Sequence, residues 1–280
     1  MSQTRIDYAD QVRAAASFIS SVCADLPDIA IQLGTGLGGL ADHMVIEHTI
    51  PYSDIPYFPK PTVESHLGAL LIGSLDATRI ILLAGRFHYY EGYSTRQITL
   101  PIRALQIAGV KRLVVTNAAG GLNPLFKPGT IMVIRDHLNF LGENPLRGIN
   151  VDDWGPRFPD LSEPYDPPMI KKMLDSADTC GIDKVVTGTY VCIPGPSLET
   201  PAETRWLRDC GADAVGMSTV PEVIVANHGS MKVLGLSLVS NVNDPDNFQP
   251  ILLEDIIAEG RRAAGRLEKL IVEFISRLHN

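Results

Sequence analysis

Long hydrophobic runs are missing from this 280-residue sequence, and no stretch approaches the ~20 apolar residues that a membrane-spanning helix needs. The N-terminal stretch 1–7 also lacks the basic and apolar regions of a secretory signal peptide. Positive charge is scarce, because 24 Lys and Arg stand against 32 Asp and Glu, a net charge of −8. Such acidity disfavours non-specific binding of nucleic acids or anionic membranes, although a local basic pocket can still hold a small anion. We therefore expect a cytoplasmic protein with no nucleic-acid or membrane partner.

Cysteine pairs and clustered metal ligands are also missing. The four cysteines lie far apart and none forms a C-x-x-C pair, which favours reduced, buried thiols. The seven histidines are scattered, and none makes the H-x-x-x-H pair that binds zinc on a helix. No Ser–His–Asp set and no catalytic pair of carboxylates is recognisable. We expect neither a metal site nor a cofactor.

Short apolar runs alternate with amphipathic stretches along the chain. Helical spacing of apolar residues predicts helices at about 8–22, 98–108, 169–177, 202–209, 222–228 and 253–278. Strands are predicted at 29–33, 69–72, 79–83, 113–116, 131–134, 185–192, 214–215 and 233–239, the second and third close enough to form a hairpin. This alternation indicates an α/β fold, a sheet with helices on both faces. Because no repeat or linker interrupts the chain, we expect one domain over 1–280.

A glycine-rich loop, Gly34–Gly39, follows the first predicted strand and satisfies G-x-G-x-x-G. A dinucleotide-binding fold would also need an acidic residue ~20 positions later, at the end of a second buried strand. Asp54 stands at that distance, but the surrounding segment 51–56 does not read as a buried strand. We therefore interpret the loop as an anion-binding turn, in which glycines expose backbone N–H groups and Thr35 adds a hydroxyl. A plain strand-to-helix turn is the alternative.

A second loop, Gly85–Tyr93, also follows a buried strand. Arg86 and His88 are two residues apart, so they would point the same way in an extended segment. A guanidinium and an imidazole that converge at the end of a strand suit a phosphate, and Glu91 could orient and charge His88. The alternative is a surface loop with a salt bridge.

Further polar segments follow other predicted strands, at 116–123, 195–200, 215–222 and 240–241. Open α/β sheets bind their ligands at the carboxyl ends of strands. Ser218 is predicted at a helix N-terminus, where Thr219 and Glu222 would form a capping box. Together the loops predict an anion subsite and a neutral polar subsite. The first comprises Thr35, Arg86, His88, Ser218 and the amides near Ala118, and the second Glu199 and Asn241. An anion site without an obvious nucleophile indicates that bound phosphate is itself the nucleophile.

Five ordered motifs resemble those of the trimeric-class purine nucleoside phosphorylases, the inosine and guanosine phosphorylases. The motifs are Gly34–Gly38, Gly85–Gly92, Thr116–Gly121, Gly195–Thr200 and Gly216–Glu222, and the likeness extends to the C-terminal helix. The resemblance implies an α/β fold, a single-domain twisted mixed β-sheet flanked by helices, in a homotrimeric pentosyltransferase of purine salvage. It implies phosphorolysis of 6-oxopurine (deoxy)ribonucleosides to the free base and α-(deoxy)ribose 1-phosphate, with phosphate as co-substrate and no cofactor.

The resemblance also implies a role for each matching residue. Phosphate would be held by Thr35, His66, Arg86, His88, the Ala118 amide and Ser218, and the ribose would lie by Tyr90 and Met217, next to His66. The base would be bound by Leu198, Glu199, Val215 and Asn241, with Phe158 contributed by the neighbouring subunit. The expected catalytic residues are His88, Glu199, which accepts from the purine N1 edge, and Asn241, which contacts N7 and the 6-oxo group.

Departures from the family pattern leave alternatives open. Leu198 stands where the family often has a stacking Phe, and the segment 242–248 does not follow the usual pattern. An apolar residue near Leu253 replaces a His that often reaches the ribose 5′-hydroxyl, so a 5′-methylthioadenosine or methylthioinosine phosphorylase is an alternative. Asn241 favours 6-oxopurines, because the methylthioadenosine enzymes typically have Asp there. A non-catalytic nucleoside-binding protein is more remote, because the residues expected to carry catalysis are all present.

Overall fold

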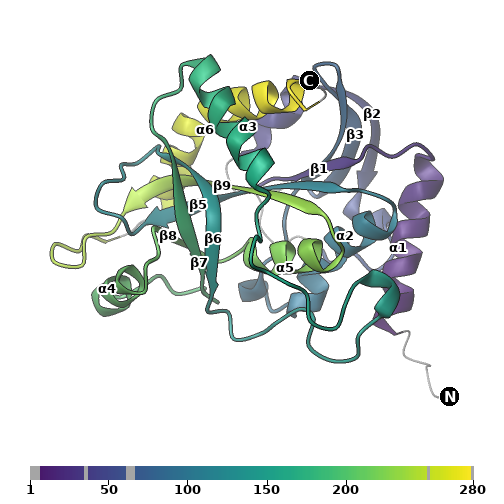
Figure 1. The fold of residues 1–280 in the computed structure, drawn as a ribbon, viewed down its shortest axis with the longest axis horizontal. Helices are drawn as coiled ribbons and strands as arrows, with labels where there is room; N and C mark the ends of the chain where they lie inside the picture. Colours follow the sequence, from purple (N-terminus) through teal and green to yellow (C-terminus); the bar gives the residue numbers. More distant parts are fainter. Residues whose placement is uncertain (1–6, 35–36, 61–66, 251–252, 279–280) are drawn as a thin grey trace.

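Nine strands form one mixed sheet in the computed structural model, which describes residues 7–34, 37–60, 67–250 and 253–278 (Figure 1). Their order is β2-β3-β4-β1-β5-β8-β7-β6-β9, and β5 pairs with β9 as well. The strands are β1 Ile29–Gln32, β2 Met44–Pro51, β3 Ala69–Leu75, β4 Thr78–Ala84, β5 Arg112–Gly121, β6 Ile131–Asn139, β7 Val185–Cys192, β8 Ala214–Gly216 and β9 Lys232–Val242. The extra pairing closes the last five strands of that order into a ring.

Strand directions divide the sheet into two parts. On one side, β2, β3 and β4 are antiparallel neighbours, and β3 and β4 form the predicted hairpin. In the centre, β1 runs parallel to β4 and β5, and β5 runs parallel to β9. Parallel neighbours end at the same edge of the sheet, so the segments that follow β1 and β4 lie beside the ends of β5 and β9.

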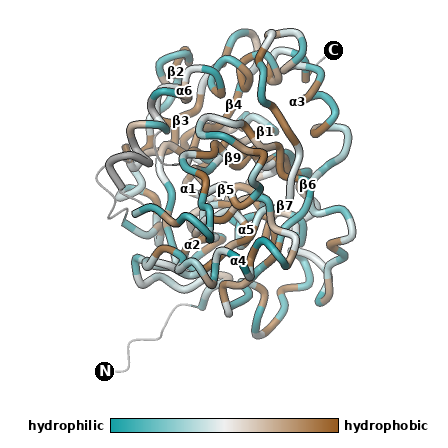
Figure 2. The backbone as a smooth tube through the Cα atoms, turned by 90° about the vertical axis from the view of Figure 1, so that its left-hand side faces the viewer, coloured by the Kyte–Doolittle hydropathy of each residue, from teal (hydrophilic) through white to brown (hydrophobic). Residues whose placement is uncertain are grey.

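Helices cover both faces of the sheet. The helices are α1 Tyr8–Val22, α2 Thr95–Ile107, α3 Pro167–Cys180, α4 Pro201–Asp209, α5 Val220–His228 and α6 Leu253–Ser276. One buried core lies under α1, α2 and α5, and a second under α3 and α6. In β1, Ala30 contributes to the first core while Ile29 and Ile31 contribute to the second, as the two-residue period of a strand requires. Figure 2 shows the hydrophobic residues concentrated on the central strands.

The predicted elements are all present, and the α/β fold class is confirmed. Two kinds of difference remain. First, β2 was not predicted, because it is an edge strand whose residues are mostly exposed and carry little apolar signal. Second, β5 and β9 continue through Gly121 and Val242, so residues 116–121 and 240–241 belong to strands rather than to the loops we expected. All nine strands share one sheet, which supports the predicted single domain. Within the described residues, no helix has the length and apolar character to cross a membrane.

A close contact between β1 and β5 generates a stability prediction. The Gly34 N–H donates to Thr116 Oγ1 at 2.9 Å, and a Cβ added at Gly34 would lie 2.7 Å from Asn117 Cα and from Thr116 O. Because those neighbours are backbone atoms, Gly34→Ala should lower the free energy of unfolding by about 1–3 kcal/mol in urea titrations. Gly38→Ala is the matched control, since a Cβ there meets no atom within 4 Å. Equal effects of the two variants would contradict the prediction.

Candidate active site

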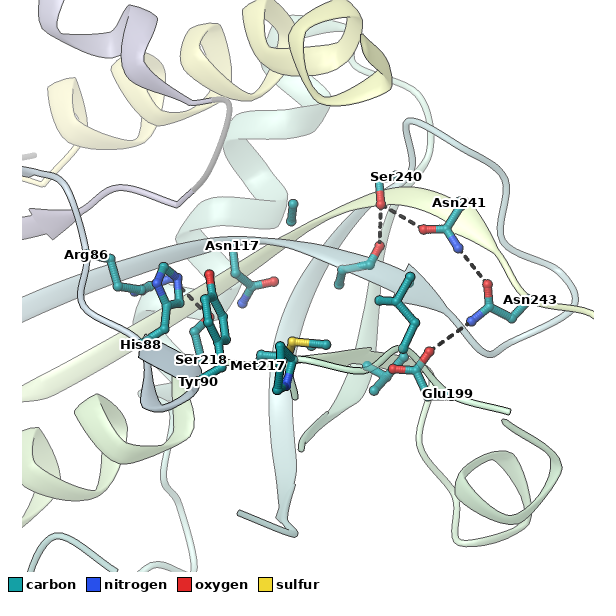
Figure 3. A pocket seen from close by; sticks show the side chains of 17 residues that line it. Arg86, His88, Tyr90, Asn117, Glu199, Met217, Ser218, Ser240, Asn241 and Asn243 are labelled. Atoms are coloured by element: carbon teal, nitrogen blue, oxygen red, sulfur yellow. Dashed lines mark hydrogen bonds between the residues drawn. The ribbon is translucent and has the colours of Figure 1, made fainter. Parts of the chain in front are cut away.

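A cavity of about 380 Å³ lies where the ends of several strands converge. Residues after β4 form one wall, the ends of β5 and β9 form another, and the segments after β7 and β8 complete it (Figure 3). Arginine, histidine and serine side chains gather at one end, and a carboxylate and amides gather at the other (Figure 3). Tyr90, Leu198, Val215 and Met217 line the cavity as well and give it apolar surface.

Arg86 is anchored at the first end by a buried ion pair. Its Nε lies 2.9 Å from Glu222 Oε1, and both side chains are almost fully buried. Nη1 donates to Thr116 O at 2.7 Å and lies 3.2 Å from Ser218 Oγ. Nη2 has no hydrogen-bond partner among the described residues. The guanidinium is therefore held rigidly, with donors left for an anion in the cavity.

His88 is oriented by Glu91, as predicted. Glu91 Oε1 lies 2.8 Å from His88 Nδ1 and also accepts from the His88 backbone N–H at 2.8 Å. Because a carboxylate only accepts, Nδ1 carries the proton. The imidazole stacks on the Tyr90 ring with centroids 4.7 Å apart. Contacts on the ring face and on Nδ1 thus determine how His88 faces the cavity.

The predicted capping box of Thr219 and Glu222 is wrong. Thr219 adopts φ 75° and makes no side-chain cap, and its hydroxyl instead accepts from Asn117 Nδ2 at 2.9 Å. The Glu222 carboxylate instead forms the ion pair with Arg86. A buried guanidinium is a stronger partner for a carboxylate than one backbone N–H, so the tertiary contact overrides the local motif. Ser218 still lies just before α5, lining the cavity.

A row of hydrogen bonds crosses the second end of the cavity (Figure 3). Asn243 Nδ2 donates to Glu199 Oε2 at 3.3 Å, and Asn241 Nδ2 donates to Asn243 Oδ1 at 2.5 Å. Ser240 Oγ lies 2.9 Å from Asn241 Oδ1. Burial raises the pKa of the Glu199 carboxyl above its ordinary value. This end can accept one hydrogen bond and donate another to a neutral, planar, polar ligand.

Most of the predicted site residues line this one cavity: Arg86, His88, Tyr90, Ala118, Leu198, Glu199, Val215, Met217, Ser218 and Asn241. Phe158 does not, and its side chain is 86% exposed. Thr35, His66 and the side chain of Leu253 lie outside the described residues. Asn117, Ser240 and Asn243 line the cavity without having been assigned to the site. Asn243 follows Asn241 by two residues, so a longer predicted strand would have placed both on one face.

Metal ligands do not gather here or elsewhere in the described part of the chain, where no group of three His, Cys, Asp or Glu side chains could hold an ion. Arg86 and His88 are instead paired with carboxylates beside the cavity, and Glu199 accepts from an amide.

Known proteins match this chain over almost its whole length. The family model of the phosphorylase superfamily matches residues 28–276. Purine nucleoside phosphorylase 1 of Bacillus subtilis (strain 168) is 45% identical over 267 residues, which cover 95% of this chain and 98% of the relative. Purine nucleoside phosphorylase of Bos taurus is 45% identical over 271 residues, covering 95% and 92%.

Solved structures agree with the sequence comparison. A schistosoma purine nucleoside phosphorylase in complex with hypoxanthine superposes with a TM-score of 0.91 at 39% identity, covering 96% of this chain and 97% of the other. Isoform 2 of the Schistosoma mansoni enzyme, in complex with cytosine and ribose-1-phosphate, gives 0.90 at 43% identity, with 96% of each chain covered.

The chain therefore belongs to the phosphorylase superfamily and, within it, to the purine nucleoside phosphorylases. The resemblance stated from the five motifs is confirmed. The protein is an enzyme, a pentosyltransferase that cleaves purine nucleosides by phosphorolysis.

The ion pair of Arg86 and Glu222 generates a prediction about both stability and the anion end. Arg86→Ala should lower the free energy of unfolding by about 3–5 kcal/mol, because it leaves a buried carboxylate unpaired. It should also raise the KM for phosphate about 10- to 100-fold through the loss of charge-assisted hydrogen bonds. In Arg86→Ala/Glu222→Gln the unpaired charge is removed, so stability should partly recover while the KM for phosphate stays high. Urea titrations and initial rates test this, and an unchanged KM would exclude Arg86 from the phosphate site.

Proposed function

We propose that this enzyme prefers 6-oxopurine (deoxy)ribonucleosides, such as inosine and guanosine, and that inorganic phosphate is its co-substrate. The observation that carries this proposal is that the Glu199 carboxylate and the Asn241 amide line the same end of the cavity, linked through the Asn243 amide. A 6-oxopurine has an N1–H donor beside acceptors at O6 and N7. Glu199 supplies the acceptor, and the second N–H of Asn241 Nδ2 supplies the donor.

The opposite end of the cavity suits phosphate. Arg86, His88 and Ser218 offer hydrogen-bond donors there, and the Ala118 backbone is close by. The ribose would lie between the two ends, beside Tyr90 and Met217. Burial raises the pKa of Tyr90 to about 12, so its hydroxyl remains a donor at neutral pH.

This arrangement supports cleavage before attack. The C1′–N9 bond breaks, its electron pair leaves with the purine, and positive charge develops on the sugar. The negative phosphate stabilises that charge, while Asn241 stabilises the electron-rich base. A phosphate oxygen then forms the new bond at C1′ on the opposite face, giving the α-sugar 1-phosphate. His88, oriented by Glu91, holds the phosphate nucleophile in place. The rate acceleration therefore comes from orientation and electrostatic stabilisation.

Two related structures support the proposal. Hypoxanthine, a 6-oxopurine, is bound by the schistosoma enzyme, and ribose-1-phosphate by isoform 2 of the Schistosoma mansoni enzyme. The Schistosoma mansoni enzyme has also been solved with adenosine. A direct comparison of the two base classes is therefore the decisive test.

The base preference is tested at Asn241. The unchanged enzyme should consume inosine faster than adenosine or methylthioadenosine, and only when phosphate is present. Asn241→Asp should shift the ratio of kcat/KM values from inosine toward adenosine by roughly 10- to 100-fold, because a mismatched buried polar group costs about 1–3 kcal/mol. Asn227→Asp is a control outside the cavity. If the unchanged enzyme prefers adenosine, or if Asn241→Asp leaves the ratio unchanged, the assignment of Asn241 to the base fails.

We extend the proposal to a cytoplasmic homotrimer in which Phe158 completes the site of a neighbour. The Phe158 ring is exposed and lies outside its own subunit's cavity, and the Arg157 guanidinium lies over it, 5.5 Å from the ring centroid. A large exposed aromatic residue is typical of an interface.

Phe158→Ala should raise the KM for the nucleoside about 10-fold or more while sparing the KM for phosphate, because an aromatic anchor of an interface is worth on the order of 1–3 kcal/mol. Ile149→Ala is the matched control, because it also lies between β6 and α3 and is 91% exposed. Light scattering at the assay concentration should show a trimer. Full activity from a strictly monomeric species would refute the shared site.

A further inference from the structure

Asn243 touches both of the groups assigned to the base. It lines the cavity and is only 4% exposed. Its Nδ2 donates to Glu199 Oε2, and its Oδ1 accepts from Asn241 Nδ2. A single amide therefore connects Glu199, before α4, with Asn241 on β9. No other side chain among the described residues makes a hydrogen bond to both.

The backbone of Asn243 is fixed independently of these side-chain contacts. Its N–H donates to Gly121 O at 2.9 Å, and its carbonyl accepts from Arg208 Nη2 at 2.8 Å. Arg208 Nε donates to Leu122 O at 2.6 Å, so α4 is tied to the end of β5 at the same place. The Asn243 side chain thus starts from a rigid position.

The absence of a side chain at Gly120 leaves the two amides uncrowded. A Cβ added there would lie 3.3 Å from Val215 Cγ1, 3.6 Å from Asn243 Nδ2 and 3.8 Å from Asn241 Nδ2. The remaining N–H groups of the two amides can therefore face a bound base.

The direction of each amide in the row follows from Glu199. An ionised carboxylate only accepts hydrogen bonds, so Asn243 must turn its Nδ2 toward Glu199. Its Oδ1 then faces Asn241, which must turn its own Nδ2 toward Asn243. Asn241 Oδ1 is left to the Ser240 hydroxyl, 2.9 Å away. The Glu199 carboxylate thereby fixes the orientation of both amides and of the Ser240 hydroxyl.

We propose that Asn243 is a positioning residue that sets the preference for 6-oxopurines by locking the amide of Asn241 with its N–H toward the base. This inference rests on the proposed function, because it assumes that Glu199 and Asn241 bind the purine. A 6-aminopurine would need Asn241 to turn its Oδ1 toward the 6-amino group. That rotation brings Oδ1 against Asn243 Oδ1, and a second rotation at Asn243 brings its Oδ1 against the Glu199 carboxylate. Each rotation places two oxygen acceptors face to face, where they repel. Only protonation of Glu199, which turns one acceptor into a donor, removes this repulsion.

The lock is coupled to the protonation of Glu199. Burial and the nearby Glu203 carboxylate raise the pKa of Glu199, and the hydrogen bond from Asn243 lowers it. Activity on a 6-oxopurine needs the ionised form, so it is lost as the pH falls through this pKa. Removing the Asn243 amide raises the pKa further, which moves the acid limb of the pH profile to higher pH.

Two substitutions test the lock in the full-length enzyme. Asn243→Leu keeps the approximate size and removes both hydrogen bonds. Asn243→Asp keeps the shape and can still accept from Asn241, but an ionised carboxylate cannot donate to Glu199. Asn123→Ala is the matched control, because it removes an amide-to-carboxylate hydrogen bond to Asp213 beside the cavity without lining it. The readouts are kcat/KM for inosine and for adenosine at saturating phosphate, measured as a function of pH, and the KM for phosphate.

We expect Asn243→Leu to lower the inosine-to-adenosine ratio about 10-fold or more, with the acid limb for inosine displaced to higher pH. Asn243→Asp still accepts from Asn241, so it should keep the ratio at pH values above the acid limb while it displaces that limb to higher pH. The KM for phosphate should change less than about twofold, and Asn123→Ala should leave the ratio and the limb where they are. If Asn243→Leu does not fold, the smaller Asn243→Ala, which also removes both hydrogen bonds, takes its place.

The outcomes separate this inference from the proposed function. If the unchanged enzyme prefers inosine but Asn243→Leu keeps its ratio, Asn243 is not the lock, and the proposed function stands. If Asn243→Leu lowers activity on both nucleosides equally, the role of Asn243 is structural only and the inference is overturned. If the unchanged enzyme does not prefer inosine, the proposed function fails on that measurement alone, and the inference falls with it.

Discussion

The parallel pairing of β5 with β9 holds both ends of the cavity in place. The register runs from Arg112 opposite Lys232 to Gly121 opposite Val242, and it shifts between Ala119 and Gly120. Because of that shift, Ser240 is the extra residue on β9. A bulge bends a strand and redirects its side chains. In a regular strand Asn241 and Asn243 would share a face and Ser240 would not, yet all three line the cavity. The pairings of β5 with β1 and of β1 with β4 bring β5 beside Arg86, which donates to Thr116 O.

Two buried carboxylates perform different tasks at the two ends. Glu222 is paired with Arg86, so the anion end keeps a rigid guanidinium whose charge is partly balanced before phosphate arrives. Among the described residues Glu199 makes no ion pair and accepts instead from the Asn243 amide, which leaves its acceptor character available to a neutral base. This division matches the two parts of a nucleoside phosphorolysis: a charged co-substrate at one end and the uncharged base of the nucleoside at the other. The apolar surface between them suits the sugar.

Much of the fold and of the site could be predicted from local patterns. Apolar periodicity located β1, the β3–β4 hairpin, α1 and α6, because each of these has a strongly buried face. The edge strand β2 was missed because little of it is buried. The ends of β5 and β9 were predicted as loops because Gly120, Gly121 and Asn241 favour turns. Their strand conformation comes from backbone pairing with residues more than a hundred positions away, a contact that local propensity does not report.

The sequence by itself determined the residue types at the strand ends, and with them the family and the chemistry of the two subsites. Arg86, His88 and Glu91 are close in the chain, so the link between His88 and Glu91 follows from local spacing. The tertiary structure decided the partners of the remaining charged groups. Glu222 pairs with Arg86 instead of forming the predicted capping box, and Asn243 bonds to Glu199, 44 residues away. Such contacts depend on which strands become neighbours, and a buried charge takes the strongest partner that this arrangement brings within reach.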